Sequence, residues 1–207
     1  NKENDYFNQT DLFLYDLDEQ ESEKLNGGAL FAPAWHPSGN MIYYTKKPII
    51  PNKYGSRFFD IYEYNLEKKK EKRLTKFQRA YNPVFISSDS SLAFLSTHDG
   101  SQNIYYLNLK TEKITQLTDF DDHSILRGLS YDSENHRLLY NRTMHHYRDI
   151  YYYSLTDSTT DVIIANELWD ERDVHYSNGA LIYSDDRSGV YNLRINDEYY
   201  VTNVTGG

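Results

Sequence analysis

The sequence has 207 residues, of which 39% are hydrophobic and 15% aromatic, and 21 of them are Tyr. No run approaches the roughly 20 apolar residues that a membrane helix needs, so we expect no membrane insertion by this segment. The net charge of −9 disfavours a nucleic-acid partner, and the lack of Cys excludes disulfides, thiolate metal sites and a Cys nucleophile.

A strand-like phrase recurs five times along the chain. Its positions alternate with a period of two, which is typical of a half-buried strand. The copies are DLFLYDL from Asp11, DIYEYNL from Asp60, NIYYLNL from Asn103, DIYYYSL from Asp149 and GVYNLRI from Gly189. A second phrase follows each copy, at Leu25-Asn26, Leu74-Thr75, Leu117-Thr118, Ile163-Ile164 and Val204-Thr205.

A strand, a polar turn and another strand precede each of the last four copies. These segments are PAWHPSGNMIYYT from Pro33, PVFISSDSSLAFLS from Pro83, GLSYDSENHRLLYN from Gly128 and VHYSNGALIYS from Val174. Four strands in roughly 40–50 residues match one propeller blade. We therefore predict an all-β fold, a β-propeller of four-stranded antiparallel blades with about four complete blades plus a half blade in an incomplete ring. The half blade is placed at 1–28, and the blades at 29–78, 79–123, 124–168 and 169–207.

The unit from Pro33 to Thr75 resembles the TolB-like propeller repeat, a relative of the WD repeat. It carries P-x-W-x-P-x-G-x-x-I-x-Y, then D-I-Y-x-Y-x-L, then L-T. Later units depart from the pattern, since Gly128 replaces the first Pro. Similar proteins have six or more blades, so we interpret the chain as an internal piece of a longer protein.

The resemblance implies a non-catalytic scaffold for protein–protein interaction, in the periplasm or cell envelope and within a larger complex or transport assembly. The alternative is the substrate-gating propeller of a prolyl oligopeptidase-type serine peptidase whose catalytic domain lies outside this chain. A sugar-binding or lyase propeller is a third, weaker hypothesis. The repeat occurs in many unrelated proteins, so it specifies the fold more closely than the function.

Catalytic motifs are missing from the sequence. It contains no G-x-S-x-G elbow, no H-E-x-x-H and no Gly-rich phosphate loop. We therefore expect no catalytic residue and no cofactor in this segment.

Two acidic clusters are weak candidates for a hard cation such as Ca²⁺. Asp119, Asp121 and Asp122 form the first, and Asp170, Glu171 and Asp173 with His175 form the second. Neither spacing fits a complete Ca²⁺ loop, so solvated loops are the favoured interpretation and no metal is assigned.

The first strand of each blade lines the channel of a propeller, and loops at its mouth bind partners. The candidate partner-binding residues at this mouth are Tyr81, Arg127, Arg172 and Asp173. Arginines there could grip the carboxylate of a protein or peptide partner. The competing interpretations are that these positions are polar because they are wet, or that the long loop from Lys46 to Arg57 docks the partner.

Equivalent positions of the repeat should fill the space between blades. On this basis we predict burial of Trp35, Phe85, Leu92, Phe94, Ile104, Tyr106, Leu138, Tyr140, Ile150, Tyr152, Ile182, Tyr183 and Tyr191.

Overall fold

The computed structural model describes residues 10–48, 56–87, 90–144 and 146–205, and within these ranges every regular element is a strand. The strands are β1 (Asp11–Tyr15), β2 (Ser22–Gly27), β3 (Ala29–Trp35), β4 (Met41–Lys46), β5 (Asp60–Asn65), β6 (Lys70–Arg73), β7 (Ala80–Ile86), β8 (Ser91–Ser96), β9 (Asn103–Asn108), β10 (Ile114–Gln116), β11 (Ile125–Asp132), β12 (Arg137–Met144), β13 (Tyr147–Ser154), β14 (Thr160–Ile164), β15 (Glu171–Ser177), β16 (Ala180–Asp185), β17 (Asn192–Ile195) and β18 (Tyr199–Tyr200).

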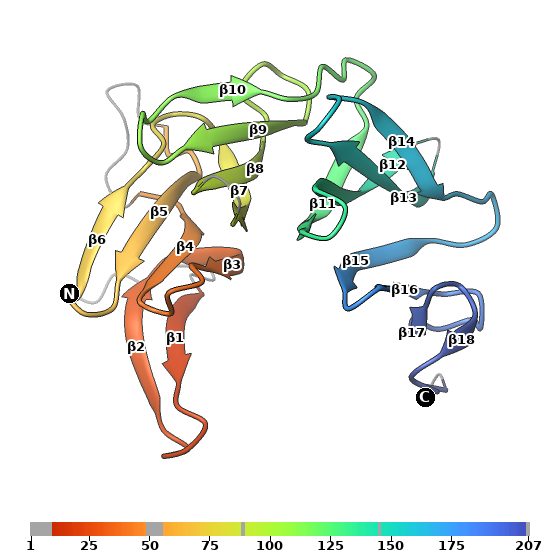
Figure 1. The fold of residues 1–207 in the computed structure, drawn as a ribbon, viewed down its shortest axis with the longest axis horizontal. Helices are drawn as coiled ribbons and strands as arrows, with labels where there is room; N and C mark the ends of the chain where they lie inside the picture. The colour runs from red at the N-terminus through yellow and green to blue at the C-terminus, as the bar shows by residue number, and fades with distance from the viewer. Residues whose placement is uncertain (1–9, 49–55, 88–89, 145, 206–207) are drawn as a thin grey trace. The chain divides into compact units, whose positions relative to one another are not determined.

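Consecutive strands pair into four four-stranded sheets, which we number as blades 1 to 4 (Figure 1). They are β3-β4-β5-β6, β7-β8-β9-β10, β11-β12-β13-β14 and β15-β16-β17-β18. Neighbouring strands run antiparallel, as in the pairing of β4 with β5. The predicted all-β propeller of four-stranded blades is confirmed. Strands β1 and β2 form a separate two-stranded sheet; its interpretation as a half blade, the incomplete ring and the blade boundaries stay predictions.

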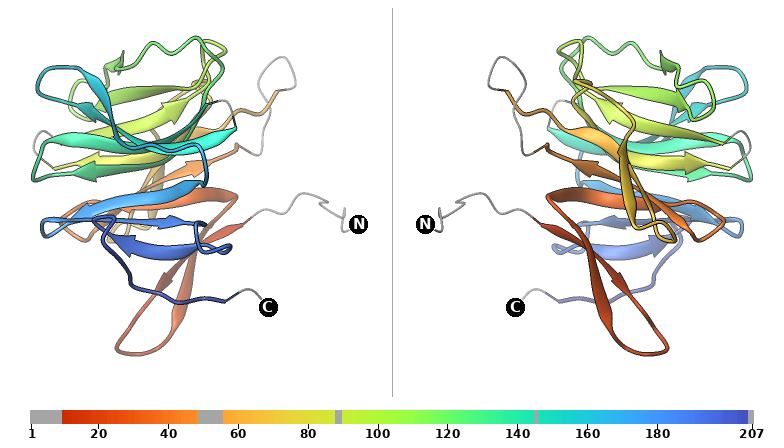
Figure 2. Two further views of the ribbon diagram at one scale, coloured as in Figure 1. Left: turned by 90° about the vertical axis from the view of Figure 1, so that its right-hand side faces the viewer. Right: turned by 90° about the vertical axis from the view of Figure 1, so that its left-hand side faces the viewer.

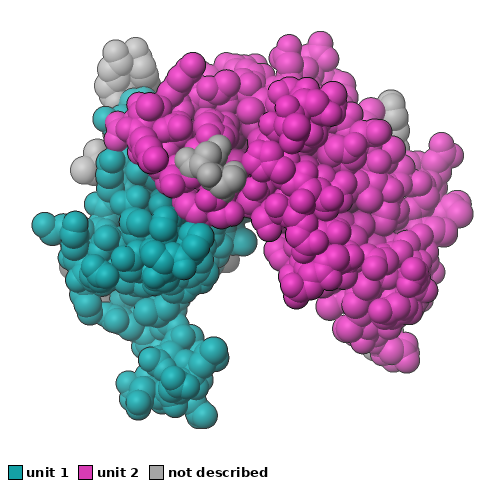
Figure 3. Space-filling view, viewed as in Figure 1, with its two compact units in different colours: residues 1–83 teal, residues 84–207 magenta. Residues whose placement is uncertain are grey.

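The chain divides into two compact units, which Figure 3 colours separately. Unit 1 is Asn1–Pro83 and unit 2 is Val84–Gly207, so the division falls within β7. Each unit is described by itself below.

The core of unit 1 lies between the β1–β2 sheet and one face of blade 1. Its buried members are Leu12, Ala29, Ile42, Tyr44, Tyr62 and Tyr64. Trp35 pairs with Ile42 and so shares that face, yet Trp35 is 50% exposed, and its predicted burial is wrong. The physical reason is that the adjoining sheet has only two strands, which cover the start of β3 at Ala29 but not its end at Trp35.

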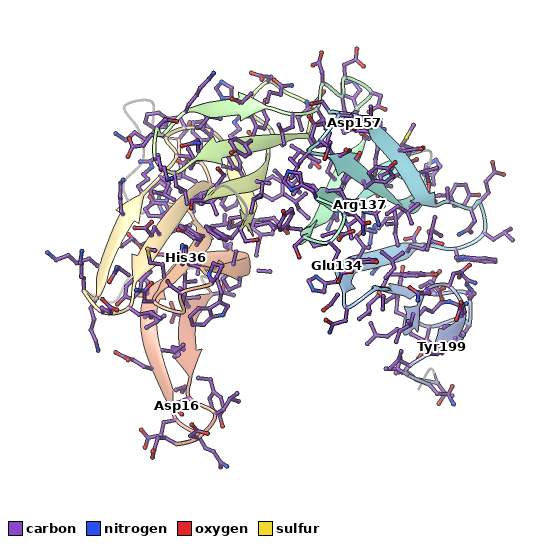
Figure 4. The ribbon with its side chains drawn as sticks, viewed as in Figure 1. Asp16, His36, Glu134, Arg137, Asp157 and Tyr199 are labelled. Carbon is purple, nitrogen blue, oxygen red and sulfur yellow. The ribbon has the colours of Figure 1, made fainter. Side chains whose placement is uncertain are left out.

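Blades 3 and 4 share a core within unit 2. Its buried members are Leu139, Ile150, Val174, Leu181 and Tyr183. Arg137 also bridges the two blades, because its guanidinium lies over the rings of Tyr152 (5.0 Å) and Tyr176 (5.8 Å) and pairs with Asp132 (2.8 Å). Glu134, labelled with Arg137 in Figure 4, accepts a hydrogen bond from Gly179 N (3.2 Å).

Most of the predicted core is buried, but not all of it. The fully buried members are Leu92, Phe94, Ile104, Leu138, Tyr140, Ile150 and Tyr183. Half-buried members are Phe85, Tyr106, Tyr152, Ile182 and Tyr191. Within this group, Phe85 lies in a first strand, Ile182 in a second strand, and Tyr106 and Tyr152 in third strands.

A side-chain lock explains why the two sequence phrases recur together. In blade 1, Thr75 Oγ1 accepts a hydrogen bond from Ile61 N (2.9 Å) and donates one to Asp60 Oδ1 (2.8 Å). The same pair of bonds joins Thr118 to Ile104 and Asn103 in blade 2, and Thr202 to Leu193 and Asn192 in blade 4. The hydroxyl thus joins the segment just after the last strand to the start of the third strand.

The lock corrects the alignment of the last repeat. Asn192, and not Gly189, pairs with Asp185 as Asp60 pairs with Lys46. Thr202, and not Thr205, supplies the hydroxyl. In blade 4 the first phrase therefore begins three residues later than the sequence pattern indicated, and the second phrase lies three residues earlier.

The first strand of every blade contains one residue with left-handed backbone. These residues are Phe31 (φ 62°), Asn82 (φ 53°), Gly128 (φ 60°) and Asp173 (φ 54°). In blades 1, 3 and 4 the strand register shifts at this point, which marks a β-bulge. Bulges re-aim neighbouring side chains, so they set the directions of Arg127 and Arg172. Figure 2 shows the sheets from two further sides.

Candidate functional site

Three arginines of unit 2 gather where β11, β13 and β15 lie close together, and we name Arg127, Arg148 and Arg172 the arginine cluster. Arg127 is exposed, whereas Arg148 and Arg172 are half-buried. Burial lowers the pKa of Arg148, and the nearby guanidinium groups of Arg172 and Arg127 lower it further, against the opposing effect of Asp170. Two of the sequence-predicted residues, Arg127 and Arg172, therefore both lie close enough to Arg148 for their charges to act on it.

Asp170 contacts two members of the arginine cluster and the neighbouring Tyr191. Its Oδ1 accepts a hydrogen bond from Arg148 N (3.2 Å), and its Oδ2 accepts one from Tyr191 Oη (3.3 Å). The Arg172 guanidinium lies 3.8 Å from the centre of the Tyr191 ring and 3.6 Å from Asp170 Oδ2. Ring and carboxylate together hold Arg172 in place, because cation–π and charge contacts act on the same group.

The cluster retains unused donors. The Nε atoms of Arg148 and Arg172 are buried, and neither has a hydrogen-bond acceptor among the described residues. A guanidinium N–H buried without an acceptor is costly, and a carboxylate is the acceptor whose geometry fits it best. Asp186 lies beside this group as well, because its Oδ1 accepts a hydrogen bond from Asp170 N (2.9 Å).

The other two predicted residues, Asp173 and Tyr81, each have their own contacts. Asp173 N donates a hydrogen bond to Asn141 Oδ1 (3.0 Å), so the backbone of Asp173 fixes the bulge of β15, and its side chain is exposed. Tyr81 belongs to unit 1, where its ring lies 5.0 Å from that of Phe31. The predicted joint site of all four residues stays a prediction.

Sequence reasoning missed Arg148, Asp170 and Tyr191 as parts of this site. Arg148 and Tyr191 stand directly before Asp149 and Asn192, as Phe59 and Gln102 stand directly before Asp60 and Asn103 in blades 1 and 2. Gln102 Oε1 accepts a hydrogen bond from Leu126 N, at the start of the next blade (2.5 Å). This recurring position before the Asp or Asn of each third strand was the available signal, because it reaches toward a first strand.

A buried acid lies behind the cluster. Glu171 is fully buried at the start of β15, where it pairs with Asp185 of β16. Its Oε1 accepts a hydrogen bond from Asn166, and its Oε2 has no partner among the described residues. Burial and the nearby Asp149 raise the pKa of Glu171 to about 8, so this carboxyl holds a proton at neutral pH.

The first acidic cluster of the sequence analysis is engaged in protein contacts. Burial alone would raise the pKa of Asp122, but hydrogen bonds from Ser124 and the guanidinium of Arg142 lower it. Asp119 and Asp121 are exposed. Across the described ranges no three His, Asp or Glu side chains are placed to hold a metal ion, and we assign no cation to this loop. The described residues also form no helix able to cross a membrane.

Solved structures share this arrangement of blades. TolB from Acinetobacter baumannii matches with a TM-score of 0.63 and 17% identity, over 89% of this chain and 48% of that one. A putative TolB from Agrobacterium tumefaciens matches with a TM-score of 0.65 and 16% identity, over 85% and 65%. The chain has the fold of a TolB-type β-propeller. No protein-family model matches the sequence, and neither does any curated protein.

The same propeller fold also occurs as a domain of a protease. The β-propeller domain of the Trilobed protease from Pyrococcus furiosus matches with a TM-score of 0.65 and 15% identity, over 96% of this chain and 63% of that one. The chain spans between about half and two thirds of these three structures. Identities this low show a shared fold and leave activity and partners to be argued from the residues.

Proposed function

We propose that this chain is part of a non-catalytic propeller scaffold that binds a protein partner, and that the arginine cluster receives a carboxylate of that partner. The observation that carries the proposal is the pair of buried Nε–H groups of Arg148 and Arg172 without acceptors. A carboxylate bound there would accept charge-assisted hydrogen bonds from at least two guanidinium groups. Partial desolvation would make these bonds stronger than those on an open surface.

The setting in the cell belongs to the proposal as well. The likeness to TolB structures favours a scaffold in the periplasm or cell envelope. The likeness to the propeller of a protease favours the second candidate, a substrate-gating propeller beside a peptidase domain. Both candidates present a peptide to the propeller, so the arginine cluster would serve either of them.

The test compares two fluorescently labelled hexapeptides of one sequence, with a free and with an amidated C-terminus. If the arginine cluster binds a carboxylate, the free acid binds at least about tenfold more tightly, and Arg127→Ala with Arg172→Ala removes this preference. The matched control is Lys110→Ala with Lys113→Ala, which removes two exposed charges of unit 2 and should keep the preference. Equal binding of acid and amide by the unaltered protein, or a preference that survives the double Arg change, contradicts the proposal.

A further inference from the structure

A separate surface of unit 1 consists of packed aromatic rings, and we name Phe31, Phe58, Phe59, Phe77 and Tyr81 the aromatic patch. The Phe31 ring lies 5.0 Å from that of Tyr81 at 34° and 5.9 Å from that of Phe59 at 85°. The Phe58 ring meets that of Phe77 edge-on at 6.5 Å. The consecutive residues Phe58 and Phe59 thus join two groups of rings.

The patch is open to solvent. Phe31 is 53% exposed and Phe77 is 49% exposed, although both rings have aromatic neighbours. Exposed aromatic side chains that are held by other rings offer a large apolar area at low cost in side-chain entropy. Such residues are enriched where proteins bind one another.

The backbone of the patch is strained. Phe31, Phe77 and Arg79 all have left-handed backbone, with φ of 62°, 60° and 50°. At the place of Phe31, the other blades have Asn82, Gly128 and Asp173, which are residue types that tolerate this conformation. A bulky side chain at such a position costs stability, and strain of this kind is concentrated at functional sites.

Cations surround the rings. Lys47 Nζ lies 5.4 Å from the centre of the Phe59 ring, and the Arg79 guanidinium lies 4.8 Å from that of Phe58. Arg57 and Lys76 belong to the segments 56–60 and 76–81 that carry these rings, and both side chains are exposed. The single acid of these two segments, Asp60, is fully buried and bound to Arg73 and Thr75. In a chain of net charge −9, this surface is locally positive.

We propose that the aromatic patch binds an acidic protein segment through an aromatic side chain of that segment. The partner's ring would stack on Phe31 and Phe59, and its carboxylates would face Lys47 and Arg79. Charge complementarity selects an acidic segment over a basic one. This inference rests on the proposed function, since it requires a protein partner, but it uses residues of the other unit.

The probes are three labelled pentapeptides, DEFDE, DEADE and KKFKK, each acetylated and amidated so that no terminal carboxylate can occupy the arginine cluster. Fluorescence anisotropy at low salt measures their Kd for the 207-residue protein. We expect DEFDE to bind at least about tenfold more tightly than either of the others. Equal affinity for DEFDE and DEADE, or tighter binding of KKFKK, would overturn the proposal.

Variants of the protein locate the binding. Phe31→Gly removes the ring and relieves the left-handed strain, so the variant should unfold at an equal or higher temperature than the unaltered protein. We expect it to weaken DEFDE binding at least about tenfold. Phe13→Ala, which removes a ring that is 54% exposed on β1, is the matched control and should leave the Kd unchanged. Unchanged binding by Phe31→Gly would overturn the proposal.

The two proposals can fail separately. The double variant Arg127→Ala with Arg172→Ala should keep the preference for DEFDE over DEADE, because both peptides carry the same carboxylates and the aromatic patch contains neither arginine. Loss of that preference in the variant would overturn the aromatic-patch proposal. A neutral oligosaccharide that binds in a Phe31-dependent manner, with no binding of DEFDE, would also overturn it. Neither result bears on the preference of the arginine cluster for a free C-terminus.

Discussion

Asn141 of blade 3 holds the backbone of Asp173 in blade 4. Its Oδ1 accepts a hydrogen bond from Asp173 N (3.0 Å), and its Nδ2 donates one to Glu171 O (3.1 Å). The side chain of Asn141 is buried, and Arg172 lies between the two residues that it holds. One amide therefore fixes the strand that presents Arg172.

Replacing Asn141 with Ala should destabilise unit 2 by about 1–3 kcal/mol, because it leaves buried backbone groups of β15 without partners. Urea unfolding followed by circular dichroism measures the change. The exposed Thr156→Ala in the same unit should cost less than about 0.5 kcal/mol. A cost for Asn141→Ala as small as that of Thr156→Ala would show that the amide does not fix β15.

The bulge of β11 requires a glycine at position 128, because the backbone there lies close to the side chain of Asn141. A Cβ at Gly128 would lie 2.6 Å from Asn141 Oδ1, and the residue has left-handed backbone. We expect Gly128→Ala to cost roughly 2–3 kcal/mol, from the strain and the displaced amide. Gly100→Ala is the control, since a Cβ there meets nothing within 4 Å and only the backbone penalty of about 1 kcal/mol applies. Equal costs for the two changes would argue against the close approach.

The strands were predictable because their pattern is local. Alternation in phrases such as DIYEYNL specifies a strand whatever it packs against, and Asp60 with Thr75 repeats in blade 2 as Asn103 with Thr118. Blade 4 was misaligned because Gly189-Val190-Tyr191 imitates the phrase three residues before the true start at Asn192. The local sequence pattern cannot decide which of two starting residues, Gly189 or Asn192, begins the phrase, whereas the pairing of Asn192 with Asp185 does.

The candidate site was predictable only in part. Arg127 and Arg172 stand in first strands, and the repeat places them there. Arg148 comes from a third strand, and only the packing of blade 3 on blade 4 brings it near Arg172. The left-handed residue of each first strand was also hidden, because no residue type is common to Phe31, Asn82, Gly128 and Asp173.

The stability of unit 2 should depend on pH through Glu171. Burial and Asp149 raise the pKa of Glu171 from 4.5 to about 8, and Asp185 acts in the same direction, against Arg187 and the hydrogen bond from Asn166. Between these two values the folded state binds more protons than the unfolded state, so the free energy of unfolding falls as pH rises. The expected slope from this group is about 1.4 kcal/mol per pH unit, ending near the folded pKa.

Glu171→Gln should remove that slope, because the amide keeps a neutral group in place. The measurement is urea unfolding at several pH values between about 5 and 9, with the exposed Glu198→Gln of blade 4 as the control. We expect the Gln variant at position 171 to gain stability relative to the unaltered protein as pH rises. A constant difference between the two proteins across this range would show that Glu171 does not titrate there.

Phe94 tests the core packing of blade 2. Its side chain is fully buried in β8 and stacks on Tyr105 at 5.8 Å. Phe94→Ala should cost on the order of 3–5 kcal/mol, since it leaves a cavity as well as removing buried apolar surface. Phe13→Ala, at an exposed position on β1, should cost far less. A loss below about 1 kcal/mol for Phe94→Ala would mean that the register of β8 is wrong.

The most direct test of the proposed function observes the arginine side chains themselves. In ¹⁵N NMR spectra, the Nε–H signals of Arg148 and Arg172 should shift when the free-acid hexapeptide is added, because these donors gain a carboxylate acceptor. The Nε–H signal of Arg137 is the internal control, since Arg137 Nε already donates a hydrogen bond to Asp132 Oδ2 (2.8 Å) and should not move. Binding of the peptide with no change at Arg148 and Arg172 would contradict the assignment of the arginine cluster as the carboxylate site.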